Sequence, residues 1–333
     1  MTKGVLVLSW REIERLLDFD DVISVVEEAF REKGLNRVQM PPKMYLFFDE
    51  YNGDLRVMPA YISKFRMAGV KVVNVHPNNP KRGLLTVMAT ILLVDPESGA
   101  PLAVMDGTLI TAYRTGAGGA IAIKYLARRG SRVLGVIGAG VQGHIQTLFS
   151  SRVMKLERVK VYDVVYSKAE SYKKEIEKTL GVDVVICESA ECAVRGVDVL
   201  VTATPAKGPV VKAEWIEQGL HINAIGADAP GKQELDPAIL KRAKIVVDDI
   251  EQASHSGEIN VPLSQGVISL KDIYAELGEI VAGKKPGRIA EDEITVFDST
   301  GLAIQDVATA QLVYRKALKE GLGIMMDFVK MTA

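Results

Sequence analysis

A glycine-rich turn between an apolar run and a helical pattern constrains the fold of this chain more than any other feature. The turn is Gly138-Ala139-Gly140-Val141-Gln142-Gly143; it follows the apolar run 133–137 and opens a helical pattern at 141–154. This strand–turn–helix setting is the one in which G-x-G-x-x-G indicates a dinucleotide site. The first glycine permits the tight turn, the second lets the backbone approach a pyrophosphate, and the third lets helix and strand pack closely. Backbone N–H groups and the positive end of the helix dipole would then bind the phosphates.

A second signal, the acidic residue Asp163, agrees with this interpretation. Asp163 ends the next apolar run and follows Gly143 by 163 − 143 = 20 residues. Folds of this type place an acid at about that distance to hydrogen-bond the ribose hydroxyls. Val164, Val165, Tyr166, Ser167 and Lys168 follow without an arginine, so the pattern favours NAD over NADP, whose 2′-phosphate the acid would repel. A glycine-rich turn in an unrelated parallel sheet is the alternative, and the context and spacing together disfavour it.

Length, charge and cysteine content narrow the class of protein. A chain of 333 residues is long enough for about two domains. The net charge of −1 gives no bulk field that would recruit nucleic acid or an anionic membrane, and no apolar run approaches the ~20 residues that span a bilayer. Cys187 and Cys192 are too few for a disulfide framework and are interpreted as inert small hydrophobic residues. A cytoplasmic protein is expected.

The chain before the glycine turn is expected to form a sheet-containing domain. Short turns separate strand-like runs at 43–48, 55–58, 68–75, 86–94 and 102–105. Closely spaced strands of this kind predict a largely antiparallel sheet, hence an α+β domain. Two helices are expected near the N-terminus, one opened by a capping box at Ser9 and Glu12 and the next capped by Asp20. A helical pattern over 108–128 contains Gly116, Gly118 and Gly119, which predict close packing on another element.

After the glycine turn, strand-like and helical stretches alternate. The strand-like runs are 182–186, 197–202, 221–225, 245–247 and 294–297. Alternation predicts βαβ units and a parallel sheet covered on both faces. The last helix, over 302–320, is expected to return to the first domain. The predicted fold class is therefore α/β, a Rossmann-type doubly wound parallel sheet accompanied by an α+β domain.

Three groups of residues carry candidate chemistry. Lys71 lies inside an apolar run, where burial would lower its pKa and suit proton transfer, although an edge-strand lysine facing solvent is the alternative. Asp228 lies in the turn that follows an apolar strand and could activate a water molecule or simply serve that turn; the pattern leaves these readings about even. Asp298 or Ser299 could cap the last helix, and the same residues could also contact the cofactor. Residues 202–204 end a predicted strand, so a ligand that lies over the carboxyl end of this strand would contact them.

The motifs together resemble one family, the ornithine cyclodeaminase/mu-crystallin family. They occur in order over nearly the whole chain: Met40-Pro41-Pro42-Lys43, 69–77 around Lys71, Arg114-Thr115-Gly116, 221–232, Gly257-Glu258-Ile259 and 297–301. The resemblance implies a homodimer joined through the first domain, with the active site between domains. It assigns residues 1–118 and 302–333 to substrate binding and dimerisation, and 119–301 to NAD binding.

Within this family, Arg56 helps to choose among activities. Members that cyclise ornithine resemble this chain but have a glutamate there for the distal amine, whereas an arginine would repel that amine and could clamp a carboxylate. Archaeal alanine dehydrogenases look similar at 40–43, 53–56 and 231–236. The resemblance therefore favours oxidative deamination of L-alanine to pyruvate and ammonia, and its reverse. Ornithine cyclodeamination, reduction of cyclic ketimines such as pyrroline-2-carboxylate, and non-catalytic dinucleotide binding are the alternatives.

The site expected from these motifs is as follows. Lys71 and Asp228 are the expected catalytic residues, and Lys43, Arg56 and Arg114 the expected substrate carboxylate clamps. The expected NAD-binding residues are Thr115, Gly138, Ala139, Gly140, Val141, Gln142, Gly143, Asp163, Thr202, Ala203, Thr204, Ile225, Gly226, Asp298 and Ser299. No metal site is expected, because the four histidines lack ligand spacing. The stretch 255–258 is expected to be a surface loop.

Overall fold

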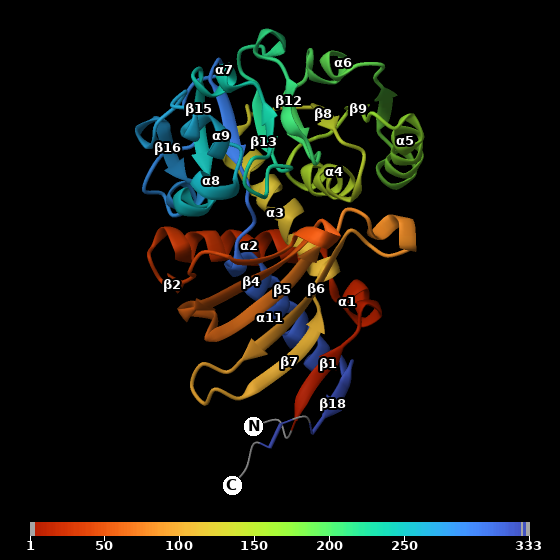
Figure 1. Cartoon of the computed structure of the whole chain (residues 1–333), viewed down its shortest axis with the longest axis vertical. Coiled ribbons are helices and arrows are strands. Elements are labelled where there is room, and N and C mark those ends of the chain that lie inside the picture. The colour runs from red at the N-terminus through yellow and green to blue at the C-terminus, as the bar shows by residue number, and fades with distance from the viewer. Residues whose placement is uncertain (1–3, 328, 331–333) are drawn as a thin grey trace. The chain divides into compact units, whose positions relative to one another are not determined.

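The computed structural model describes residues 4–327 and 329–330, and the chain divides into two compact units. Unit 1 comprises Met1–Arg114 and Leu302–Ala333, and unit 2 comprises Thr115–Gly301. Helix α3 (Thr108–Leu126) carries the chain from the first unit into the second. The sequence places the boundary between residues 118 and 119, inside the same helix. Figure 1 labels the elements of both units.

Unit 1 is built on a mixed sheet in the strand order β18-β1-β7-β6-β5-β4-β2, with β3 also paired to β4. All these pairs are antiparallel except β1 with β7, which agrees with the α+β domain expected from the sequence. The strands are β1 (Val5–Leu8), β2 (Val38–Gln39), β3 (Met44–Phe48), β4 (Gly53–Ile62), β5 (Met67–Val75), β6 (Val87–Val94), β7 (Pro101–Asp106) and β18 (Ile324–Met326).

Three helices of unit 1 pack around one face of this sheet. They are α1 (Trp10–Leu16), α2 (Phe19–Gly34) and α11 (Ala303–Glu320), and α11 contacts β4, β5, β6 and α2. The capping box from Ser9 to Glu12 is present. The cap expected at Asp20 is wrong: Asp18 has the extended backbone of an N-cap, and its carboxylate accepts hydrogen bonds from the N–H groups of Asp20 and Asp21. Asp20 is therefore already helical.

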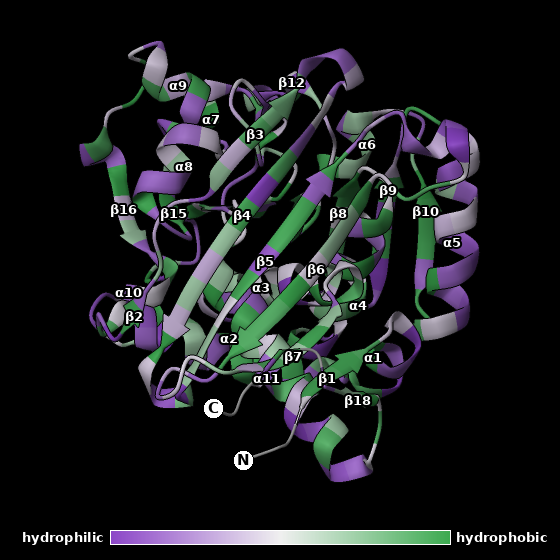
Figure 2. Cartoon of the chain, turned by 60° about the horizontal axis from the view of Figure 1, so that its bottom comes forward, coloured by the Kyte–Doolittle hydropathy of each residue, from purple (hydrophilic) through white to green (hydrophobic). Residues whose placement is uncertain are grey.

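The two faces of the sheet differ in burial. Side chains alternate along β4 and β5, so every second residue is buried beneath α11 and the residues between them face the other way. The opposite face carries half-exposed apolar side chains at Val57, Pro59, Tyr61, Val70, Val72, Leu92 and Val104. In Figure 2, β4, β5 and β6 lie in front, and no helix crosses them.

Unit 2 is a fully parallel sheet in the order β10-β9-β8-β11-β13-β17-β15-β16. Its strands are β8 (Val133–Ile137), β9 (Arg158–Tyr162), β10 (Asp183–Ile186), β11 (Val199–Thr202), β13 (His221–Ala224), β15 (Ala243–Val247), β16 (Ile273–Glu276) and β17 (Ile294–Asp298). The chain runs outward from β8 to β10 and then returns to β8 to add β11 on its other side. This reversal of strand order is the switch point of a doubly wound fold, so the predicted fold class is confirmed.

Helices and a small second sheet complete unit 2. The helices are α4 (Val141–Val153), α5 (Tyr166–Leu180), α6 (Ala190–Val194), α7 (Pro237–Leu240), α8 (Ile250–Ser256), α9 (Asn260–Ser264) and α10 (Leu277–Val281). Strands β12 (Lys207–Val211) and β14 (Gln233–Leu235) pair with each other. The glycines of α3 permit close packing on α4, because a Cβ at Gly116 would lie 2.4 Å from Phe149 and one at Gly119 would lie 2.0 Å from the Gln146 Oε1.

The two cysteines of unit 2 form a disulfide, so their interpretation as separate, inert hydrophobic residues was wrong. Cys187 follows β10 and Cys192 lies in α6, with their Cα atoms 5.6 Å apart. That separation is within the range that a disulfide spans. The chain turns back between the two residues, which their spacing in the sequence does not reveal. No helix in the described ranges combines the length and apolar character that crossing a bilayer requires.

Candidate active site

Lys71 is the centre of a buried charge cluster in unit 1. It lies in the middle of β5, its side chain is 0% exposed, and its Nζ donates to the Asp306 Oδ1 at 2.7 Å. The alternative of an edge-strand lysine facing solvent is therefore wrong, because β5 pairs on both sides, with β4 and with β6. An uncompensated ammonium at this depth would be strongly unfavourable. The carboxylate of Asp306 supplies the missing charge.

Arg114 binds the same carboxylate oxygen. Its Nε donates to the Asp306 Oδ1 at 2.9 Å, and its Nη1 donates to the Gln305 Oε1 at 3.3 Å. Two cations therefore converge on one oxygen, while the Oδ2 of Asp306 is buried without a hydrogen-bond partner among the described residues. A buried acceptor in that state is expected to receive a donor from a ligand or water.

Asp306 was missed by the sequence reasoning. It lies in the first turn of α11, where its neighbours from Ala303 to Gln311 are all buried. A charged residue inside such an apolar helical stretch is a signal that could have identified it, because a fully buried acid needs a partner. The partner itself, Lys71, is 235 residues away in the sequence.

The surroundings of Lys71 tune its protonation. Burial lowers the pKa of Lys71 from 10.5 to about 7; the charges of Arg114 and Lys43 also lower it, and Asp306 raises it. Desolvation and like charges both disfavour the ammonium form, whereas the carboxylate favours it. Near neutral pH the side chain can therefore either donate or accept a proton. This is the property that a general acid–base group requires.

Arg56 lies beside this cluster on the same face of the sheet. It is opposite Val73 on β5, while Lys71 is opposite Met58, so Arg56 and Lys71 are diagonal neighbours. Its side chain is nearly buried and forms a two-point ion pair with Asp54, at 2.8 Å from the Nε and 3.0 Å from the Nη2. A substrate carboxylate at Arg56 would have to share it with Asp54. Lys43, half-buried, precedes β3.

The glycine turn of unit 2 has the geometry that a dinucleotide needs. Gly138 has φ +102°, which favours glycine, and a Cβ there would lie 2.6 Å from the carbonyl oxygen of Ala203. A Cβ at Gly143 would lie 2.0 Å from the carbonyl oxygen of Gly138, so this glycine brings α4 against the turn. A Cβ at Gly140 would meet no atom within 4 Å. The backbone at Gly140, which caps α4, thus faces open space suited to a phosphate group.

Asp163 holds the turn from the neighbouring strand. It follows β9, and its carboxylate accepts hydrogen bonds from the N–H of Ala139 at 2.9 Å and the N–H of Val165 at 2.8 Å. A carboxylate can accept about four hydrogen bonds, so it keeps acceptor capacity for ribose hydroxyls. Asp163 and the turn thus lie together, as the spacing in the sequence predicts. Val141, the first residue of α4, is exposed. The Oε1 of the next residue, Gln142, is buried and has no hydrogen-bond partner among the described residues.

Strand register aligns the remaining predicted cofactor residues along one edge of the sheet. Ile137 pairs with Thr202, Thr202 with Ala224, and Ala224 with Asp298. The residues that follow these positions, including Ala203, Thr204, Ile225, Gly226 and Ser299, therefore lie along the carboxyl edge, where open α/β sheets bind ligands. The Oγ of Ser299 is buried without a hydrogen-bond partner among the described residues. Thr115 is buried in α3, and its carbonyl accepts from the Gln146 Nε2.

The predicted acids of unit 2 have distinct partners. Asp228 is partly exposed and forms an ion pair with Lys232, four residues on in the same turn. The carboxylate of Asp298 accepts from the N–H of Ile259 at 3.1 Å. The expectation that Asp298 or Ser299 caps the last helix is wrong, because that helix begins at Ala303 after Leu302. The turn between β17 and α11 is held instead by the carboxylate of Asp248, which accepts hydrogen bonds from the N–H groups of Thr300 and Gly301.

The burial of two glutamates of unit 2 was not predicted, although both lie in stretches that resemble the family. Glu234 and Glu258 are both fully buried, so the expected surface loop over 255–258 is wrong. Residues up to Ser256 belong to α8, and Glu258 turns inward to accept from the N–H groups of Glu234 and Leu235. No signal in a single sequence distinguishes a glutamate of this kind from an exposed one.

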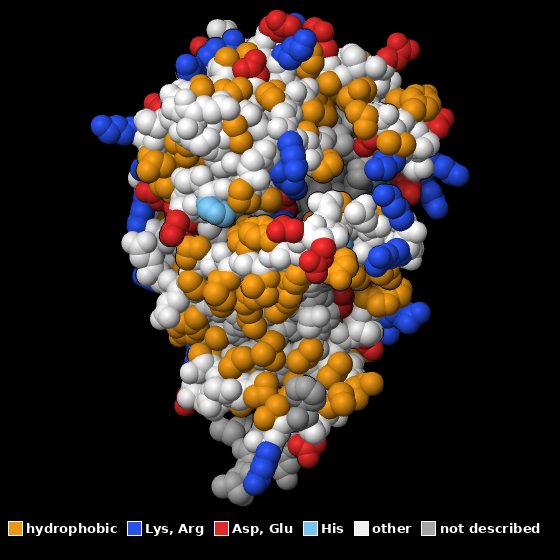
Figure 3. Space-filling view, in the orientation of Figure 1, with side chains coloured by type: hydrophobic (Ala, Val, Ile, Leu, Met, Phe, Trp, Pro, Cys, Tyr) orange, Lys and Arg blue, Asp and Glu red, His pale blue; other side chains and the backbone are white. Residues whose placement is uncertain are grey.

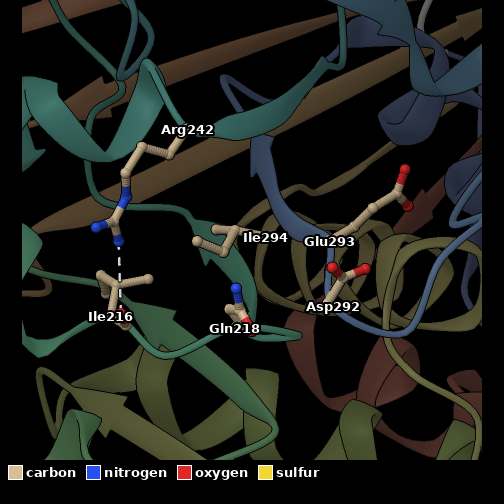
Figure 4. A pocket seen from close by; sticks show the side chains of 6 residues that line it. All are labelled: Ile216, Gln218, Arg242, Asp292, Glu293 and Ile294. Atoms are coloured by element: carbon tan, nitrogen blue, oxygen red, sulfur yellow. Dashed lines mark hydrogen bonds between the residues drawn. The ribbon is translucent and has the colours of Figure 1, made fainter.

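A cavity of about 380 Å³ lies elsewhere in unit 2. Figure 4 shows its lining, which is Ile216, Gln218, Arg242, Asp292, Glu293 and Ile294. Arg242 directly precedes β15, and Ile294 is the first residue of β17, so this cavity is at the amino edge of the parallel sheet. None of the predicted site residues lines it. The predicted cofactor residues belong instead to the carboxyl edge of this sheet.

The residues at the carboxyl edge fit a dinucleotide. An open space before Gly140, a helix N-terminus and an acid beside the turn are the three features that such a ligand requires. Within the part of the chain that the structure describes, no three metal-ligating side chains come together.

Comparisons with known proteins place these features in a family. A model described as the ornithine cyclodeaminase/mu-crystallin family matches residues 4–321. An alanine dehydrogenase from Archaeoglobus fulgidus is 54% identical over 325 residues, covering 98% of this chain and 99% of that protein. A Delta(1)-pyrroline-2-carboxylate reductase from Bacillus cereus is 35% identical over 328 residues, covering 97% of this chain and 100% of that protein.

Two solved structures match over the same extent. An archaeal alanine dehydrogenase, a dimer with bound NAD, has a TM-score of 0.94 at 53% identity and covers 98% of this chain and 100% of that one. A Delta(1)-pyrroline-2-carboxylate reductase from Thermococcus litoralis, in complex with NADH and L-proline, has a TM-score of 0.94 at 43% identity, covering 97% of this chain and 100% of that one.

Proposed function

This chain belongs to the ornithine cyclodeaminase/mu-crystallin family, and we propose that it is an NAD-dependent L-alanine dehydrogenase. The reaction converts L-alanine, NAD and water into pyruvate, ammonia and NADH, and it also runs in reverse. The observation that carries the proposal is the buried cluster of Lys71, Arg114 and Asp306, with Arg56 as a neighbour on the same face. The similarity to alanine dehydrogenases over nearly the whole chain supports it.

The cations of unit 1 suit the carboxylate of a small amino acid. Arg114, Arg56 and Lys43 offer positive charge around Lys71, and an arginine binds a carboxylate through two parallel hydrogen bonds. Holding the carboxylate fixes the α-carbon, which converts the reaction into one between oriented groups. Arg56 and Arg114 already pair with Asp54 and Asp306, so a substrate carboxylate would share both guanidinium groups with these acids. Lys43 is assigned as the third contact.

Lys71 is the proton-transfer group of the proposal. Its pKa of about 7 lets the neutral amine take a proton from the ammonium group of the substrate. That proton must leave before the α-carbon can lose a hydride, because the nitrogen lone pair stabilises the developing cation. Asp306 keeps the lysine in place through its Oδ1 and leaves the Oδ2 to accept from the substrate nitrogen.

The residues of unit 2 hold NAD and activate water. The glycine turn with Gly140 binds the pyrophosphate, and Asp163 binds the adenosine ribose. A bound NAD would supply the acceptor for the hydride of the substrate α-carbon. Asp228 removes a proton from the water that attacks the iminium carbon. The amine then takes a proton back from Lys71 and leaves as ammonia, and loss of the hydroxyl proton gives pyruvate. An ion pair with Lys232 holds the Asp228 carboxylate in place in the turn after β13.

Arg56 argues against a diamino acid as the substrate. The distal ammonium of ornithine would meet a guanidinium on the same face as Lys71. Two like charges about 4 Å apart in a partly dry site repel by up to about 4 kcal/mol at an effective dielectric constant of 20, and the ion pair of Arg56 with Asp54 reduces this repulsion. Ornithine cyclodeamination is therefore disfavoured, although a solved lysine cyclodeaminase is 32% identical to this chain.

Reduction of a cyclic imine is the second candidate. It is favoured by the 43% identity and TM-score of 0.94 to the Thermococcus litoralis reductase. The same carboxylate clamp would hold pyrroline-2-carboxylate, and Lys71 would protonate or release the ring nitrogen. This reaction needs no water attack, so it does not use Asp228 as a base.

A substrate comparison tests the proposal. We expect NADH oxidation with pyruvate and ammonia, dependent on ammonia, and NAD reduction with L-alanine at higher kcat/KM than with L-proline, L-ornithine or L-lysine. Product analysis accompanies the assay, because cyclodeamination gives no net NADH. A higher kcat/KM for pyrroline-2-carboxylate than for pyruvate with ammonia would replace the first candidate by the second. Absence of turnover with every substrate would contradict both.

A homodimer joined through the open face of the unit 1 sheet is part of the proposal. The similar archaeal alanine dehydrogenase is a dimer. Figure 3 shows hydrophobic side chains gathered over the part of the surface where Figure 1 places β4 to β7. An apolar surface of this extent indicates an interaction site. Val72→Asp places a charge on this face, and we expect light scattering to show a monomer; an unchanged dimer mass would contradict the assignment.

A cytoplasmic location stays a prediction from the sequence. Fractionation of cells that express the native protein tests it, with the soluble fraction as the expected location.

A further inference from the structure

The carboxyl ends of β11 and β13 are tied together by one side chain, Glu234. Its Oε2 accepts from the Thr202 hydroxyl and from the N–H of Gly226, both at 2.8 Å, and its Oε1 accepts from the N–H of Thr204 at 2.7 Å. Glu234 is fully buried and lies in β14, outside the parallel sheet. A single carboxylate therefore sets the spacing between the segments that follow two neighbouring strands.

The contact between those segments leaves no room for adjustment. A Cβ at Gly226 would lie 2.2 Å from the carbonyl oxygen of Thr204 and 2.6 Å from the Glu234 Oε2. Backbone meets backbone there, with the carboxylate filling the remaining gap. A change in the position of Glu234 would thus move both segments at once.

Glu234 is itself held by a second carboxyl group. Glu258 accepts from the N–H of Glu234 at 2.9 Å and from the N–H of Leu235 at 2.7 Å. Burial, with the nearby charges of Glu234 and Asp298, raises the pKa of Glu258 well above its usual range. Burial also raises the pKa of Glu234, against the lowering effect of its hydrogen bonds from Thr202, Thr204 and Gly226.

The position of this pair identifies which half of a dinucleotide it serves. Asp163 follows β9, on one side of β8, whereas Thr202 is the last residue of β11, on the other side. If the acid after β9 binds the adenosine ribose, the dinucleotide crosses the switch point and its nicotinamide half extends toward β11 and β13. Glu234 ties the ends of these two strands.

We propose that Glu234 is a positioning residue for the nicotinamide half of the cofactor, and that Glu258 holds Glu234 in place. The inference rests on the proposed NAD site. Glu234 does not itself contact the cofactor. It fixes the backbone of residues 202–204 and 225–226, and these segments contact the nicotinamide half.

Binding of two ligands to Glu234→Gln tests the proposal. An amide in place of the carboxylate sets an NH₂ group against one of the N–H donors, so the tie between the strands is lost. Without substrate, we expect the Kd of NADH to rise at least about tenfold, a loss of about 1.4 kcal/mol. The Kd of ADP-ribose, which lacks the nicotinamide, should stay within about twofold of the wild-type value.

A matched control separates positioning from general destabilisation. Glu293→Gln removes a partly buried ion pair with Lys244 at the amino edge of the same unit, beside the cavity of Figure 4. We expect it to lower the melting temperature while leaving both Kd values unchanged. Glu258→Gln serves if Glu234→Gln does not fold, with the same selective loss expected for NADH.

Three results would overturn the proposal: an unchanged Kd of NADH in the variant, an equal loss for NADH and ADP-ribose, or a selective NADH loss in Glu293→Gln. Failure of the wild-type protein to bind NADH would instead overturn the proposed function.

Discussion

Replacing Asp306 by asparagine isolates its charge from its shape. The amide oxygen can still accept from the Lys71 Nζ and the Arg114 Nε, which lie 2.7 Å and 2.9 Å from the Oδ1. The NH₂ group takes the place of the Oδ2, where no described residue acts as a donor. We therefore expect the variant to fold with lower stability than the wild type, because the buried guanidinium of Arg114 loses its counter-charge.

The size of the expected change in the pKa of Lys71 follows from its ion pair with Asp306. A unit charge about 4 Å away contributes about 4 kcal/mol at an effective dielectric constant of 20. Each 1.36 kcal/mol corresponds to about one pKa unit, so removal of the carboxylate lowers the pKa of Lys71 by up to about three units. The wild-type value is about 7, and Arg114 and Lys43 continue to lower it in the variant. Lys71 becomes a weaker base that stays neutral in more acidic solution.

The assay is the pH dependence of kcat/KM for L-alanine, which reports ionisations of the free enzyme. We expect the wild-type acid limb near the pKa of Lys71, and in Asp306→Asn we expect it to move to lower pH by about one unit or more. The maximal rate should fall, because a weaker base transfers the proton less readily. An acid limb that stays in place would refute the role given to the Asp306 charge.

Asp54→Asn is the matched control for this experiment. Asp54 also pairs with a buried cation of unit 1, but its partner is Arg56 rather than Lys71. Its replacement frees Arg56 for a substrate carboxylate, so KM should change while the acid limb stays in place. An equal displacement of the limb in Asp54→Asn would show that the charge of unit 1 as a whole, and not Asp306, governs Lys71.

Three further predictions concern other parts of the site. Asp228→Ala should abolish deamination while leaving the Kd of NAD nearly unchanged, measured by titration calorimetry; near-normal turnover would contradict its role as base. Arg56→Glu should raise kcat/KM for L-ornithine relative to L-alanine, and no gain would undercut the use made of Arg56. Because the folded-state pKa of Lys71 is about 7 and its ordinary value is 10.5, the unfolded chain binds more protons between these values. The wild-type free energy of unfolding should thus rise from pH 7 toward pH 10.5 by up to about 1.4 kcal/mol per unit relative to Lys71→Met, and parallel curves would refute this.

Local patterns predicted the parts of this protein that depend on local physics. The glycine turn identified its own strand and helix, because the conformation of Gly138 and the close approach at Gly143 are properties of neighbouring residues. Alternating apolar residues predicted β5 and β6 to within one residue of their bounds. The hydrophobic residues on both sides of Lys71 suggested its burial, but that pattern alone favoured an edge-strand lysine facing solvent, and the pairing of β5 on both sides decided the question.

Local patterns failed where a side chain finds its partner across the fold. The capping of α2 by Asp18 rather than Asp20, and the disulfide between Cys187 and Cys192, depend on where the chain turns. The inward turn of Glu258 after α8 depends on the backbone of β14, which the sequence did not show as a strand.

The sequence by itself determined the two-part organisation and the dinucleotide turn, because glycine stereochemistry and hydrophobic periodicity act over a few residues; the resemblance of its motifs identified the family. Only the tertiary structure decided which charges meet. Asp306 reaches Lys71 across 235 residues of chain, and Glu234 joins two strands to which it does not belong. The physical reason is that a buried charge or acceptor must be compensated by whatever group packing brings within about 3 Å, and sequence distance places no limit on that choice.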